Sequence, residues 1–196
     1  MKSIIILLFA LSACSLGGLN KIENFKEIND VYMNNLIQKS RNQFYFDAMT
    51  NADLMTVEPI ALYSQVVNGI KYKVIIATQA YANTRNEVQL HEYVFYQPFN
   101  FESNSLPELE KVDKLKHFQS NGVSLNSPRY AQINAAISSY LMGSSNKLVS
   151  VNSVDSVEVY EDTYYAVKAS LQGRSMEAGF VLVENKGEYE ILARLN

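Results

Sequence analysis

The sequence predicts an α+β protein with two domains, each containing one helix packed on an antiparallel β-sheet meander. Two stretches have the three- and four-residue spacing of apolar side chains that is typical of an amphipathic helix, and strand-like stretches follow each of them. Because this order of elements occurs twice, it indicates a duplication. Asn68-Gly69 lies between two strand-like stretches and predicts a tight hairpin turn, since both residues tolerate a positive φ.

The first domain is expected to begin with a helix over about residues 25–39. Asn24 and Glu27 have the spacing of a helix-capping pair, and the apolar stripe follows them. Pro59 has no backbone N–H, so we expect a bulge or an edge position there. Strands are expected over four stretches, the last of them weaker: 53–66, 70–81, 87–97 and 106–118.

The second domain repeats this order after a polar linker over residues 119–122. Pro128 stands at the favoured first position of a helix, behind Asn126 or Ser127 as the cap. Four strands are expected after this helix: 147–160, 163–171, 177–184 and 188–194. The expected domains are therefore residues 15–118 and 119–196.

Length, charge and histidine content exclude several functions. The chain has 196 residues, which is enough for two domains of about 90 residues each. Its net charge of −3 provides no basic surface for nucleic acid. His91 and His117 are the only histidines, and no acidic or cysteine cluster accompanies them. We therefore expect no enzyme, no metal site and no cofactor.

Residues 1–14 are expected to be a signal peptide. Lys2 precedes the apolar run Ile4–Leu11, which is too short to span a bilayer and is followed by small residues. Cleavage after Cys14, the only cysteine, would leave a secreted protein without disulfides. An alternative is that Leu11–Cys14 is a bacterial lipoprotein signal, in which Cys14 is lipidated and anchors the protein at the cell envelope.

The turn carries apolar residues where polar ones are usual. Val66 and Val67 precede Asn68-Gly69, and exposed branched side chains at a turn indicate a contact surface. The alternative is an ordinary hairpin whose two valines point into the core.

The segment Gln65-Val66-Val67-Asn68-Gly69 resembles the Gln-x-Val-x-Gly signature of cystatins, the inhibitors of papain-like cysteine proteases. A glycine pair, Gly17-Gly18, precedes the expected helix as in the cystatin N-terminal trunk. Pro98-Phe99 resembles the Pro-Trp pair of the second cystatin hairpin, with Phe99 in place of tryptophan. The resemblance covers about residues 15–118 and is strongest to the plant-type branch.

The resemblance implies a wedge made of three segments: Gly17-Gly18, Gln65–Gly69 and Pro98-Phe99. The wedge would enter the cleft of a papain-like, cathepsin-type protease and inhibit it reversibly and competitively. Replacing tryptophan by Phe99 would cost on the order of 1 kcal/mol of binding. Cystatin-type folds also exchange strands through this hairpin, so a strand-swapped dimer is an alternative state.

The second domain departs from the cystatin pattern. The segment aligned with the signature, Glu158–Asp162, has extra carboxylates and no glycine, so this domain is expected to be cystatin-like in fold but not an inhibitor of papain-type enzymes. Two asparagines are weak candidates for inhibiting legumain, Asn104 in a Ser-Asn-Ser-Leu motif and Asn42 after the first helix. The alternative function for the whole chain is a non-inhibitory binding or structural module, lipid-anchored if Cys14 is retained.

Overall fold

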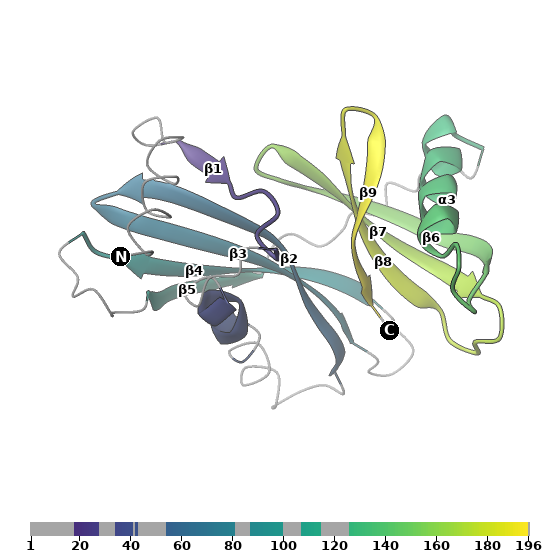
Figure 1. The fold of residues 1–196 in the computed structure, drawn as a ribbon, viewed down its shortest axis with the longest axis horizontal. Coiled ribbons are helices and arrows are strands. Elements are labelled where there is room, and N and C mark those ends of the chain that lie inside the picture. Colours follow the sequence, from purple (N-terminus) through teal and green to yellow (C-terminus); the bar gives the residue numbers. More distant parts are fainter. Residues whose placement is uncertain are drawn as a thin grey trace. The chain divides into compact units, whose positions relative to one another are not determined.

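The computed structural model describes residues 18–27, 34–40, 42, 54–80, 87–99, 107–114 and 126–195. Their strands form two antiparallel sheets, shown in Figure 1. The chain divides into two compact units. Unit 1 consists of residues 1–47, 59–76 and 91–114, and unit 2 consists of residues 48–58, 77–90 and 115–196. The expected boundary between residues 118 and 119 lies outside the described residues.

The first sheet has the strand order β1-β2-β3-β4-β5. Its strands are β1 (Leu19–Lys21), β2 (Leu54–Val67), β3 (Gly69–Ala80), β4 (Glu87–Gln97) and β5 (Glu108–Lys114). The pairing of β1 covers only residues 63–65 of β2, so Pro59 lies beyond it. Such a position suits a residue that cannot donate a backbone hydrogen bond.

The second sheet is a four-stranded meander with the order β6-β7-β8-β9. A single helix, α3 (Pro128–Tyr140), precedes it, with Ser127 as the N-cap accepting from the Tyr130 N–H at 3.2 Å. The strands are β6 (Leu148–Val159), β7 (Asp162–Leu171), β8 (Ala178–Asn185) and β9 (Glu188–Leu195). Each expected strand of this half lies within one residue of the observed one.

The expected α+β class, with two domains that each pack one helix on a meander, is wrong. The described chain is mostly antiparallel strand, and helix is confined there to α3, residues 34–40 and residue 42. Residues 23–27, where the first helix was expected to begin, form a turn instead. This turn has a local cause. Asn24 has φ 51°, whereas a helix-capping residue is extended. The Asn24 carbonyl accepts a hydrogen bond from the Glu27 N–H at 2.8 Å, which closes the turn.

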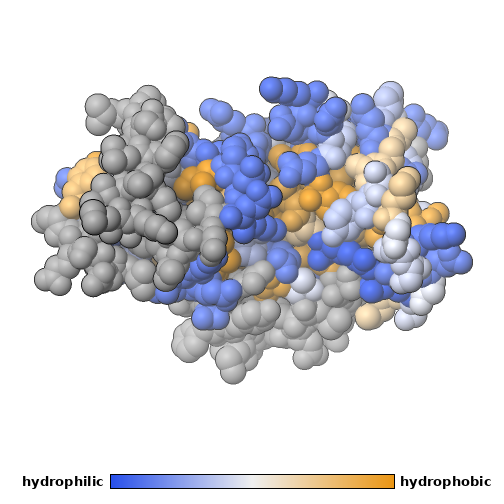
Figure 2. Space-filling view, viewed as in Figure 1, coloured by the Kyte–Doolittle hydropathy of each residue, from blue (hydrophilic) through white to orange (hydrophobic). Residues whose placement is uncertain are grey.

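Most of the buried residues described in both sheets have apolar side chains. On the face drawn in Figure 2, both hydrophilic and hydrophobic side chains are visible among the described residues. Among the described residues, eight large apolar residues are exposed, and two of them, Val67 and Phe99, belong to the expected wedge.

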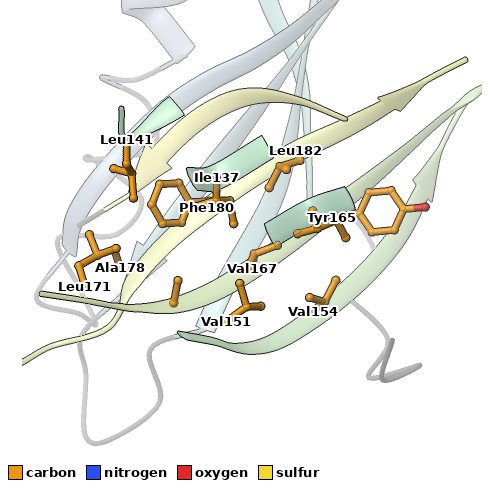
Figure 3. Close-up of a cluster of buried hydrophobic side chains, with 12 residues drawn as sticks. Ile137, Leu141, Val151, Val154, Tyr165, Val167, Leu171, Ala178, Phe180 and Leu182 are labelled. Carbon is orange, nitrogen blue, oxygen red and sulfur yellow. The ribbon is translucent and has the colours of Figure 1, made fainter. Parts of the chain in front are cut away.

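The core of the second sheet is a cluster of buried side chains from α3, β6, β7 and β8 and from Leu141 (Figure 3). Ile133 and Ile137 of α3 are fully buried against the sheet, together with Phe180 on β8. Tyr140, at the end of α3, meets the Phe180 ring edge-on with the centroids 6.3 Å apart. Since Ile133, Ile137 and Tyr140 are spaced four and three residues apart, they lie along one face of the helix.

Candidate functional site

Asn68 lies between β2 and β3, so the chain turns where the Asn-Gly pair predicts a hairpin. Val67 is 40% exposed and Asn68 is also exposed, while Val66 is half-buried. Gly69 has φ 149°, a conformation that favours glycine. The alternative in which both valines point into the core is therefore wrong for Val67. We call Val66–Gly69 the first tip.

The N-terminal segment runs beside the first tip. Leu19 on β1 lies opposite Gln65 on β2, and the pairing continues through Asn20 to Lys21. The Ile22 N–H extends this pairing by donating to the Leu62 carbonyl at 2.8 Å. Because β1 and β2 are antiparallel, Gly18 lies one residue nearer the first tip than Leu19 does. Gly17, the other member of the expected pair, lies outside the described residues.

The second tip, Pro98-Phe99, follows β4 directly. Both residues are exposed, and the Phe99 side chain is 53% exposed. In Figure 1 the β2–β3 turn and the C-terminal end of β4 lie at the same end of the first sheet. An aromatic ring that is more than half exposed at the end of a strand is available for contact with a partner.

Tyr96 joins the two tips. Its hydroxyl donates a short hydrogen bond to the backbone carbonyl of Asn68. Its ring covers Gly69 so closely that a Cβ added at Gly69 would lie 2.6 Å from the Tyr96 Cε2 atom. The same Cβ would also collide with the Gln97 carbonyl oxygen. Gly69 is thus required by the space beside it as well as by its φ.

Sequence reasoning missed Tyr96. The sequence feature that could have indicated it is an aromatic residue two positions before Pro98, on a strand next to one that begins with glycine. Aromatic side chains often cover a glycine on an adjacent strand. The pairing of Tyr96 with Gly69 depends on the register of β3 and β4, which the sequence alone does not define.

Charged side chains near the tips are paired with one another. Lys71 on β3 forms a salt bridge with Glu110 on β5 at 2.9 Å. Further along β3, Lys73 lies 3.9 Å from Glu92 on β4. The six residues of the two tips have no ionisable side chain. The arrangement can therefore bind through apolar contact and backbone polar groups, but it offers no general acid, base or nucleophile.

The other expected site residues do not join this group. Asn42 is exposed and helical. Asn104 and Cys14 lie outside the described residues. Across the part of the chain that the structure describes, no three His, Cys, Asp or Glu side chains are close enough to hold a metal ion. None of the helices in that part has the length and apolar content needed to cross a membrane.

The turn of unit 2 that follows β6 differs from the first tip. It consists of Tyr160-Glu161, and Tyr160 adopts φ 58°. Both residues are exposed, so this turn presents a phenol and a carboxylate. The substitution of polar groups for the valines makes it a poor equivalent of the first tip for entering an apolar cleft.

Four polar side chains of unit 2, those of Arg129, Tyr165, Glu184 and Tyr189, form a network of polar contacts. The hydroxyls of Tyr165 and Tyr189 donate to the same Glu184 Oε2 atom at 2.8 and 3.2 Å. Arg129 Nη2 lies 3.8 Å from that atom. Burial, followed by the hydrogen bond to Glu184, raises the pKa of Tyr165 well above its usual range. The network keeps the phenols neutral and fastens α3 to the sheet, which is a structural role.

No protein-family model and no curated protein matches the chain.

Proposed function

We propose that this protein is a reversible, competitive inhibitor of papain-like cysteine proteases and that it binds through the wedge. The observation that carries the proposal is the meeting of three segments at one end of the first sheet. Leu19 lies opposite Gln65, and Tyr96 contacts both Asn68 and Gly69. The N-terminal segment, the first tip and the end of β4 are distant in sequence but lie together, so one partner could contact all three.

The exposed side chains of the wedge suit a narrow apolar cleft. Val67 and Phe99 are 40% and 53% exposed, so both can lose water-accessible apolar area on binding. A β-branched valine has little rotamer freedom to lose, which lowers the entropic cost of binding. Phe99 provides the aromatic anchor that often dominates the energy of an interface.

The shape of the first tip supports inhibition without cleavage. Only Asn68 lies between β2 and β3, so the chain reverses direction at the first tip. A protease substrate must present an extended chain across the catalytic residues, and this turn does not. The wedge would block the catalytic cysteine and histidine of the enzyme without presenting a peptide bond to them.

Membership of the cystatin family is part of this proposal. Its support is the signature Gln65–Gly69, the second tip Pro98-Phe99 and the glycine at position 18, in the order that cystatins have them. Secretion is proposed with it, from the character of residues 1–14. Unit 2 is proposed to have no contact with the protease cleft, because its Tyr160-Glu161 turn is polar.

Titration of papain with the purified protein, monitored with a fluorogenic substrate, tests the proposal. The parent should inhibit competitively, and the variant Gly69→Glu should lose at least about a hundredfold in affinity, because the new side chain meets Tyr96 and the Gln97 carbonyl. Gly187→Glu is the matched control. Gly187 is also a hairpin glycine with positive φ, but no atom lies within 4 Å of the position its Cβ would take.

A folded, monomeric parent that fails to inhibit papain and cathepsin-type enzymes at micromolar concentration would contradict the proposal. The wedge would then have to be studied as the surface of a non-inhibitory binding module. Equal losses in Gly69→Glu and Gly187→Glu would show that general destabilisation, and not the first tip, explains the effect.

A further inference from the structure

Tyr96 makes two different contacts with the first tip. Its hydroxyl bonds to the Asn68 carbonyl, and its ring lies against the Cα side of Gly69. Asn68 is the exposed turn residue and Gly69 is the first residue of β3. Both contacts therefore act on the point where the chain reverses direction.

This point needs an external support. Glycine gives the backbone more conformational freedom than any other residue, so Gly69 by itself leaves the turn soft. Asn68 is exposed, so burial of its side chain does not hold the turn. The Tyr96 ring occupies the space that a side chain at position 69 would take, and its hydroxyl fixes the direction of the preceding carbonyl.

Tyr96 is also tied to the second tip. It precedes Phe99 by three residues, and Gln97, between Tyr96 and Pro98, is buried and ends β4. A movement of the Tyr96 backbone would thus be transmitted to Pro98-Phe99 through one ordered strand end. One side chain therefore connects the two tips that the proposed function requires to act together.

We propose that Tyr96 is a positioning residue that holds the first tip at a fixed distance and orientation from the second tip. Its effect on protease binding rests on the proposed function, whereas its effect on the order of the tip does not. A tip that is ordered before binding loses less conformational entropy in the complex, so affinity rises without any contact between Tyr96 and the enzyme. The gain should appear mainly as slower dissociation.

Two substitutions separate the hydroxyl from the ring. Tyr96→Phe removes the hydrogen bond and keeps the ring over Gly69, whereas Tyr96→Ala removes both. Tyr130→Phe is the matched control, since the Tyr130 hydroxyl donates to a backbone carbonyl, that of Val151, at 3.1 Å in unit 2. Both phenylalanine variants lose one hydrogen bond of the same kind, so their overall destabilisation should be similar.

Two measurements are made on each variant. The first is the backbone ¹⁵N order parameter of Asn68 and Gly69 in the free protein, which should fall from about 0.85 to 0.6 or below in Tyr96→Ala, with an intermediate value in Tyr96→Phe. The second is papain inhibition, in which Tyr96→Phe should raise the inhibition constant about fivefold and Tyr96→Ala more than tenfold. Tyr130→Phe should change neither.

The outcomes are distinguishable. Unchanged order parameters in both Tyr96 variants would overturn the inference, whatever the inhibition shows. Lower order parameters in a protein whose parent does not inhibit would support the positioning role of Tyr96 and overturn the proposed function. Lower order parameters with inhibition equal to that of the parent would overturn the claim that the ordered tip contributes to affinity.

Discussion

Leu19 on β1 lies directly opposite Gln65 on β2, and this pairing carries the N-terminal segment to the edge of the first tip. The strand that makes the pairing is only three residues long and lies at the edge of its sheet. We therefore expect β1 to contribute more to placing the N-terminal segment beside the first tip than to the stability of the sheet.

Deleting residues 1–21, which removes β1, should raise the papain inhibition constant about tenfold or more while lowering the melting temperature by only a few degrees. The reason is that the deletion removes one of the three wedge segments but little buried area. A deletion of residues 1–14 is the control and should inhibit like the parent. Equal inhibition by the two deletions would show that the N-terminal segment takes no part in binding.

Replacing Val67 by aspartate should weaken protease binding about tenfold to a hundredfold, because a carboxylate would have to lose its water in an apolar cleft. Val67 is 40% exposed, so stability in denaturant should change little. Val149→Asp, at a 66% exposed position on β6, is the matched control and should leave inhibition unchanged. Normal inhibition by Val67→Asp would place the first tip outside the interface.

Phe99 should determine the strength of the second contact. Phe99→Ala should lower affinity by about tenfold, and Phe99→Trp should raise it about five- to tenfold through its larger aromatic area. Because Phe99 is 53% exposed, neither change should alter the melting temperature by more than a few degrees. The check is a series of inhibition constants for the three residues, which should follow ring size. Three equal constants would be incompatible with an anchoring role.

Ile137 should contribute to stability and not to binding. Its side chain is fully buried between α3 and the second sheet, so Ile137→Ala should lower the free energy of unfolding by about 2–5 kcal/mol. Chemical denaturation followed by circular dichroism measures the loss, with the exposed Ser138→Ala as the control on the same helix. Inhibition of papain by the folded variant should equal that of the parent, and a large loss would assign unit 2 a part in the interface.

Asp155 should make the fold less stable as pH rises. Burial raises the pKa of Asp155 above its usual range, and Lys168 partly opposes this shift. The folded state then holds the proton more tightly than the unfolded state, so stability falls as pH rises from about 3.9 through the raised pKa. Asp155→Asn should therefore raise the melting temperature at pH 7 and give no gain at pH 3.

Thermal unfolding at both pH values provides the measurement for Asp155. Glu158→Gln, an exposed carboxyl on the same strand, is the control for loss of a charge. A gain from Asp155→Asn that is as large at pH 3 as at pH 7 would exclude burial of the charge as its cause.

The sequence predicted the second half of the fold well. It predicted the start of the first helix wrongly, although residues 34–39 of the expected range are helical. In unit 2 the helix and strand patterns are regular, and the cap Ser127 is followed by Pro128, so local preferences and packing agree. Around Asn24 they conflict. The capping spacing favours a helix, but Asn24 takes a left-handed conformation that closes a turn. The apolar spacing remained informative in one respect, because Phe25 and Leu36 are both buried.

The sequence by itself determined the local features of the candidate site. Asn68-Gly69 marks the turn, and Gly69 takes the positive φ that favours glycine there. Pro98 marks the end of β4, because proline cannot continue the hydrogen-bonded ladder. These features depend on the φ preferences of residues that are adjacent in the chain.

Only the tertiary structure decided that the segments meet. The pairing of Leu19 with Gln65 and the contact of Tyr96 with Asn68 join residues that are 46 and 28 positions apart. Both depend on strand order and register, and a shift of one residue would send each side chain to the opposite face. The same register exposes Val67 while it partly buries Val66. That choice is made by the packing of the whole sheet and not by the turn residues alone.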